Sequence, residues 1–252
     1  MSRAGERRVG GLLWPALAAG IAFAILVGLG TWQLARLSWK EGLIRAIAER
    51  STAAPVKAPA EGEWAGLSKG EVEYRRVTLE GSFLHASEAR IFTDLPRTKG
   101  PARGIGYWVL TPLIQADGSV VIVNRGFVPI ERADPASRRE GQTDGEVTVT
   151  GLIRWAEERN LFTPSDDPAS GQWFTRDPAA IATAAGLRRV APFTVDAEAS
   201  APGGLPQGGE TRLVLSNRHL EYALTWYGLA LGLVIVTVAS FLRGRGALTR
   251  GA

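Results

Sequence analysis

The chain has 252 residues, no cysteine and a formal net charge of +4. The lack of cysteine excludes disulfides, thiolate metal sites, Cys-x-x-Cys-His haem attachment and cysteine nucleophiles. The arginines are scattered and are not interleaved with stacking aromatics, which argues against a nucleic-acid-binding protein despite the positive charge. The apolar residues concentrate in two blocks near the ends, so only the middle of the chain can form a water-soluble domain.

Two long apolar segments predict two membrane-spanning helices. Residues 9–35 and 222–242 contain no charged residue, and both segments exceed the roughly 20 residues that a helix needs to cross a bilayer. We expect the first helix over residues 11–35 and the second over residues 218–242. A cleaved signal peptide is the alternative for the first segment, but its apolar run is too long for a signal core, which favours an uncleaved anchor.

Basic residues outside the two segments predict the orientation in the membrane. Cytoplasmic loops are enriched in lysine and arginine, and long translocated domains largely escape this rule. We therefore expect cytoplasmic termini at residues 1–10 and 243–252, a periplasmic domain over residues 61–217, and location in the inner membrane of a bacterium in contact with its lipids. The basic residues that indicate this topology are Arg3, Arg7, Arg8, Arg243, Arg245 and Arg250.

Between the two segments the apolar pattern first stays helical and then alternates. The first helix is expected to continue to about Arg50 before a Pro/Ala-rich linker, so that residues 36–60 form a helical extension and linker. The rest predicts a β-rich (α+β) domain, a small barrel or sandwich, with one helix capped by Asp177 and ended by Gly186. The expected strands cover residues 74–83, 89–93, 107–114, 120–127, 147–155, 173–175, 190–195 and 211–215.

Small residues recur every four positions in both apolar segments. Gly20, Ala24 and Gly28 form such a strip in the first, and Gly228 and Gly232 in the second. The two strips offer surfaces on which the helices could pack, although the same spacing also arises by chance.

Enzyme signatures are missing. The sequence contains no Gly-x-Ser-x-Gly elbow and no glycine loop ending in Lys-Ser or Lys-Thr, which argues against a serine hydrolase and a nucleotide site. The adjacent carboxylates Glu157-Glu158 and Asp166-Asp167 indicate a solvated loop, because consecutive side chains point apart. We therefore predict that the protein is not an enzyme and has no catalytic residues.

One of the two histidines lies at the start of the second apolar segment. As helix positions, His219, Tyr222 and Trp226 stand at i, i+3 and i+7 and share one face near the membrane boundary. An imidazole beside two large rings could bind a flat, amphiphilic, metal-containing ligand such as a porphyrin. The alternative is an interfacial aromatic belt, in which these residues only anchor the helix. The other histidine, His85, is interpreted as a surface or hydrogen-bonded residue at a strand end.

Several blocks of the sequence together resemble a known family. The stretch His219-Leu220-x-Tyr222-x-x-Thr225-Trp226-Tyr227-Gly228 is similar to the second membrane helix of the Surfeit-locus-one family of cytochrome c oxidase assembly factors. Blocks similar to the rest of that family occur in the right order along essentially the whole chain. They are residues 30–36 with 39–40, 74–77, 81–83, 108–113 and 123–129.

The resemblance implies a non-enzymatic haem chaperone. It implies that haem a is bound non-covalently, with His219 as ligand to the haem iron and Trp226 at the family's tryptophan position, for insertion or stabilisation of haem a in subunit I of the terminal oxidase. The expected partner is therefore subunit I of the terminal oxidase. Haem a synthase is a second candidate partner. From the shared helix face we expect Tyr222 to line the porphyrin together with Trp226. The alternative is a cofactor-free scaffold that stabilises an assembly intermediate, in which the block at residues 124–127 would be a docking surface or turn and core residues. A haem-synthesis enzyme fits poorly, because the chain lacks many spans and clustered histidines.

Overall fold

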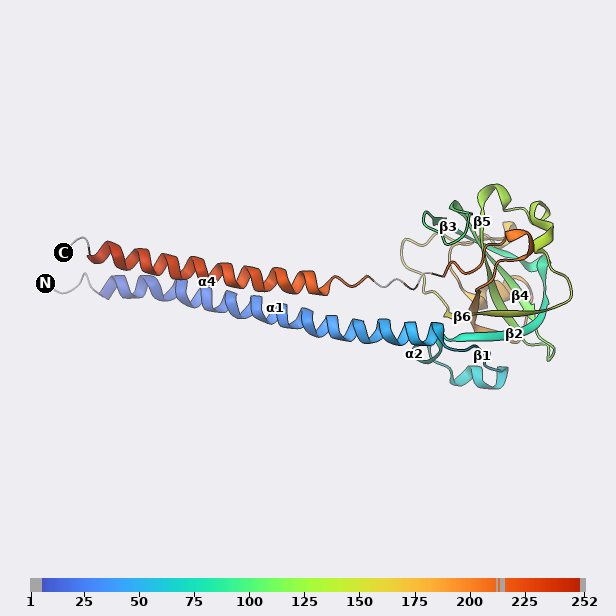
Figure 1. The fold of residues 1–252 in the computed structure, drawn as a ribbon, viewed down its shortest axis with the longest axis horizontal. Helices are drawn as coiled ribbons and strands as arrows, with labels where there is room; N and C mark the ends of the chain where they lie inside the picture. The colour runs from blue at the N-terminus through green and yellow to red at the C-terminus, as the bar shows by residue number, and fades with distance from the viewer. Residues whose placement is uncertain (1–5, 212, 214–215, 250–252) are drawn as a thin grey trace. The chain divides into compact units, whose positions relative to one another are not determined.

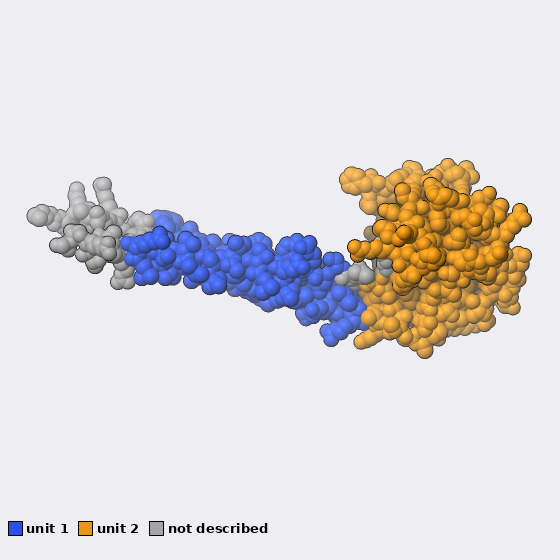
Figure 2. All heavy atoms as spheres, turned by 45° about the horizontal axis from the view of Figure 1, so that its top comes forward, with its two compact units in different colours: residues 1–45, 214–252 blue, residues 46–213 orange. Residues whose placement is uncertain are grey.

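The computed structural model of the chain describes residues 6–211, 213 and 216–249, and side chains from Trp14 to Arg243 within those ranges. These residues form two compact units. The first combines residues 1–45 with 214–252, and the second contains residues 46–213 (Figure 2).

The first unit contains two long apolar helices, α1 (Glu6–Thr52) up to Arg45 and α4 (His219–Thr249), which run side by side (Figure 1). Within them, residues Trp14–Thr52 and His219–Arg243 are long and apolar enough to cross a membrane. Large apolar side chains cover their outer surfaces, such as Ile25 at 56% exposed and Val236 at 64%. Leucine, isoleucine and valine exposed at this density are expected against lipid. The predicted pair of spanning helices is therefore confirmed, and α1 ends at Thr52, close to the expected end at about Arg50.

The two helices meet along faces that the glycine spacing does not mark. On α4 the buried positions are Ala223 and Ala230, which are 1% and 3% exposed. Gly228 lies about 160° around the helix from Ala230, at 100° per residue. A Cβ at Gly20, Gly28, Gly228 or Gly232 would have no atom within 4 Å. Packing of the helices through these strips is therefore excluded, and the close approach occurs at Gly30 instead.

The second unit is built on a five-stranded closed barrel. The pairings run β2–β6–β8–β5–β4, and β4 pairs back to β2 through Ser82 and Phe83 opposite Ile114 and Leu113. All neighbours are antiparallel except β5 and β8, which are parallel. Strands β3 and β7 extend the sheet beyond β4, and β1 pairs with β2. The expectation of a barrel or sandwich is thus resolved as a barrel.

The elements of the second unit follow the predicted order closely. The strands are β1 (Val56–Lys57), β2 (Arg76–Phe83), β3 (Ala89–Leu95), β4 (Gly104–Ile114), β5 (Val120–Pro129), β6 (Glu146–Trp155), β7 (Gln172–Trp173) and β8 (Val190–Ala197). The helices are α2 (Lys69–Val72) and α3 (Pro178–Ala184), with 3-10 turns at Glu61–Gly66, His85–Ser87, Ile130–Arg132, Pro135–Gly141, Pro168–Ser170 and Pro202–Gly204. The predicted cap of α3 is confirmed, because the Asp177 carboxylate accepts from the backbone N–H groups of Ala179 and Ala180.

The barrel interior is apolar, and a polar hub lies on the opposite face of the same strands. Val77, Leu113, Val123, Ile153 and Phe193 are fully buried in the main core. On the outer face of β8, the carboxylate of Asp196, which is 3% exposed, accepts hydrogen bonds from side chains on several elements. A buried carboxylate requires this degree of pairing. Its partners are Asn124 at 2.9 Å, Arg154 at 3.2 Å, Arg176 at 3.1 Å and Thr211 at 2.8 Å.

The strand expected over residues 211–215 is wrong where the structure describes it. Thr211 and Leu213 lie outside any strand, and residues 212, 214 and 215 are outside the described residues. The barrel is already closed by the pairing of β2 with β4, so this β-branched segment finds no ladder. Strand β1 was not predicted. It lies in the expected linker, and its two residues are too few to give an alternating pattern.

Candidate functional site

His219 is the first residue of α4, and its ring contacts α1. The Nδ1 atom lies 2.6 Å from Oε1 of Gln33. An amide oxygen only accepts hydrogen bonds, so the imidazole donates from Nδ1 and its proton sits there. Among the described residues Nε2 has no hydrogen-bond partner, which leaves its lone pair available. This is the protonation pattern of a histidine that can bind a metal through Nε2.

The other two predicted site residues differ in their surroundings. Trp226 is half-buried and lies about 40° around the helix from Ala230, so it borders the face that contacts α1. Tyr222 is 51% exposed and is turned about 80° from Ala230. His219 and Trp226 therefore share the edge of the helix pair, while Tyr222 points away from it. No described interaction joins the three side chains to one another.

A second contact holds the helices together about two turns further into α4. The ring of Tyr227 packs on Gly30, where a Cβ would lie 2.9 Å from the ring atoms Cε1 and Cζ. The Thr31 hydroxyl donates to the carbonyl of Val27 at 2.9 Å, so it accepts from the Tyr227 hydroxyl 3.1 Å away. A side chain at position 30 would therefore collide with the Tyr227 ring unless that ring moved.

The second histidine has both ring nitrogens engaged within the β domain. A guanidinium can only donate, so Nδ1 of His85 accepts from Arg125 Nη1 at 3.3 Å. The ring proton is then on Nε2, which donates to the Thr143 carbonyl at 2.9 Å. The interpretation of His85 as a hydrogen-bonded residue at a strand end is confirmed. It has no free lone pair to offer to a metal.

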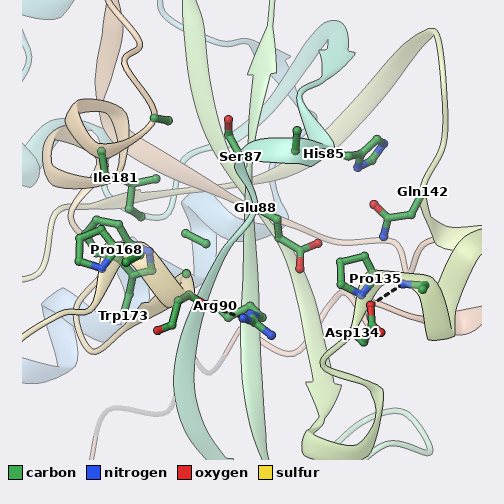
Figure 3. Close-up of a pocket in the computed structure, with 18 of the residues that line it drawn as sticks. His85, Ser87, Glu88, Arg90, Asp134, Pro135, Gln142, Pro168, Trp173 and Ile181 are labelled. Atoms are coloured by element: carbon green, nitrogen blue, oxygen red, sulfur yellow. Dashed lines mark hydrogen bonds between the residues drawn. The ribbon is translucent and has the colours of Figure 1, made fainter.

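His85 borders a cleft of about 1030 Å³ in the β domain (Figure 3). Trp173, Pro168 and Ile181 form an apolar end, and Glu88 and Gln142 reach toward each other at the polar end. Glu88 forms an ion pair with Arg138, with both side chains buried. The cleft is large enough for a cofactor, but its histidine is already bonded and its buried charges are already paired.

The block at residues 124–127 is part of the core. Asn124 and Arg125 are each 4% exposed, and Phe127 is fully buried. Asn124 binds Asp196, and the Arg125 guanidinium stacks on Phe83 at 4.7 Å and donates to the Gly141 carbonyl. Burial lowers the pKa of Arg125 to about 10. Of the two alternatives for this block, core residues are confirmed and a docking surface is excluded.

Metal ligands do not cluster in the part of the chain that the structure describes: no three His, Asp or Glu side chains there are grouped to hold an ion. Any metal bound at His219 must bring most of its own ligands, as a porphyrin does. Nothing in the sequence pattern marked Gln33 by itself as a candidate site residue. It lay inside a block that resembles the family, but only the fold shows its contact with His219.

Fold and site together define a class: membrane proteins with two spanning helices that flank an extramembrane β barrel, and with a histidine at the start of the second helix. Within that class, the SURF1 family model matches residues 20–231 of this chain. Surfeit locus protein 1 of Homo sapiens is 38% identical over 233 residues, covering 86% of this chain and 74% of the human protein. The chain belongs to the SURF1 family, which confirms the resemblance.

Other relatives match over most of both chains. The SURF1-like protein of Monosiga brevicollis is 34% identical over 258 residues, covering 96% of this chain and 92% of that protein. Surfeit locus protein 1 of Takifugu rubripes is 37% identical over 233 residues, covering 87% of this chain and 94% of the fish protein. The likeness therefore spans both helices and the barrel.

Proposed function

We propose that this protein is a haem a-binding assembly factor for the terminal oxidase and not an enzyme. It would bind haem a non-covalently, with His219 as the ligand to the iron, and deliver it to or stabilise it in subunit I. Membership of the SURF1 family supports the assembly role. The observation that most supports the haem role is the His219 imidazole, which has its proton on Nδ1 and a free lone pair on Nε2.

The residues around His219 fit a porphyrin in chemical character. Trp226 lies on the same edge of the helix pair as His219, about two turns further along α4, and the exposed Tyr222 lies on the neighbouring face of that helix. Aromatic rings of this size can cover an apolar macrocycle, which would otherwise face lipid or water. Haem a supplies the iron, and the chain supplies one nitrogen and an apolar edge.

Weak coordination suits a protein that must give its cargo away. The chain has no cysteine, and its one methionine is Met1. His85 has both ring nitrogens bonded within the β domain. A single histidine ligand from this chain would hold the haem less tightly than a bis-ligated site.

The proposed orientation places both termini in the cytoplasm and the barrel in the periplasm, against the inner membrane.

Absorption spectroscopy of the detergent-purified protein from cells that make haem a tests the proposal. We expect a haem a spectrum in the wild type and its loss in His219→Ala. Haem content that is unchanged in His219→Ala would refute the ligand assignment. A wild-type protein that is free of haem but co-purifies with subunit I would instead support the cofactor-free scaffold.

A further inference from the structure

The residue that faces His219 from α1 defines how the imidazole is presented. Gln33 lies 186 positions before His219 in the chain, yet its Oε1 atom is 2.6 Å from Nδ1. That distance is short for a hydrogen bond from nitrogen to oxygen, which usually measures 2.7–3.2 Å. Both residues are half-buried and belong to the same compact unit. The bond is therefore partly shielded from solvent, which strengthens it relative to a fully exposed one.

We infer that Gln33 is a positioning residue that fixes His219 in the Nδ1–H tautomer and aims Nε2 at the haem iron. This inference rests on the proposed function. A ligating histidine generally donates its second ring N–H to an oxygen, which fixes the tautomer and ring orientation and raises the basicity of the ligating nitrogen. Gln33 supplies that oxygen from the first span. The ligand site would thus need both helices, although only α4 provides the ligand.

The contact between Tyr227 and Thr31 provides a matched comparison. It also joins α4 to α1, at 3.1 Å, and it involves no atom of His219. Thr31→Val keeps the shape of the side chain and removes this hydrogen bond. If Gln33 only helped to hold the helices together, Gln33→Leu and Thr31→Val would have similar effects. If Gln33 positions the imidazole, only Gln33→Leu affects His219.

The tautomer can be read directly, because the chain has only two histidines. His85 donates from Nε2 and His219 donates from Nδ1, so the two rings have opposite tautomers. Nitrogen NMR of protein labelled with 15N-histidine, haem-free and in detergent, should show one ring of each kind. We expect the Nδ1–H signals to be lost in Gln33→Leu and retained in Gln33→Glu and Thr31→Val. The His85 signals serve as the internal reference.

Titration with haem a completes the test. Loss of a hydrogen-bond partner of a metal ligand typically weakens metal binding by about 10–100-fold, and we expect that loss for Gln33→Leu. Gln33→Glu keeps the acceptor and should bind at least as tightly as the wild type, as should Thr31→Val. A wild-type tautomer and affinity in Gln33→Leu, or an Nε2–H tautomer at His219 in the wild type, would overturn the inference while leaving His219 as ligand. Haem binding that survives in His219→Ala would refute both.

Discussion

The aromatic ring of Tyr227 lies directly on the backbone of Gly30, leaving no room for a Cβ on that residue. This contact, rather than the small-residue strips, sets how α4 meets α1. A Cβ at Gly28, only two residues away, would have no atom within 4 Å. The two glycines therefore differ sharply in what a larger side chain would do.

Replacing Gly30 by leucine should separate the helices. Overpacking of this kind costs about 1–3 kcal/mol, and 1.4 kcal/mol corresponds to a tenfold change in an equilibrium. In a Gln33→Cys/His219→Cys background, which has no other cysteine, a short bismaleimide should link the two helices. We expect the linked fraction to fall severalfold in Gly30→Leu and to stay unchanged in Gly28→Leu. Equal cross-linking in both variants would contradict the packing described here.

Loss of the Asp196 carboxylate should destabilise the barrel. Arg176, 6% exposed, and Asn124 would lose their shared partner. Removing one member of a buried ion pair typically costs about 3–5 kcal/mol. We expect a large drop in the melting temperature of Asp196→Ala, measured by circular dichroism in the β-sheet region. Glu80→Ala, at an exposed position on β2, should change stability by less than about 0.5 kcal/mol. Equal melting temperatures of Asp196→Ala and Glu80→Ala would contradict a stabilising role for the polar hub.

His85→Ala should affect the β domain and spare haem binding. The substitution removes the acceptor for Arg125 and the donor to the Thr143 carbonyl. Lost hydrogen bonds of this kind cost about 0.5–1.5 kcal/mol each. We expect a lower melting temperature and the haem a content of the wild type, measured by the pyridine haemochrome spectrum. A folded His85→Ala protein that has lost its haem would mean that the second histidine takes part after all.

The sequence predicted the architecture well because its signals are local. Charge-free runs marked both helices, and alternating residues with turn formers marked seven of the barrel domain's strands. It predicted the partners of those elements poorly. Three contacts join residues that are far apart in the chain. They are the pairing of β2 with β4, the hydrogen bond between Gln33 and His219, and the packing of Tyr227 on Gly30. Spacing along one helix cannot show which of its faces the other helix will cover.

The same limit explains the site. Helical periodicity placed His219, Tyr222 and Trp226 on one side of α4, but not which of them would border α1. The buried state of Arg125 was equally hidden, because an arginine in a turn-like motif is usually exposed. Only the barrel places it beside Phe83 and His85.

Rescue of the His219→Gly variant by free imidazole is the most direct test that His219 is the ligand to the haem iron. In His219→Gly, purified from cells that make haem a, the haem a spectrum should be absent and should return when free imidazole is added during reconstitution with haem a. His85→Gly should need no imidazole. The account would be contradicted if His219→Gly bound haem a to the wild-type extent without imidazole.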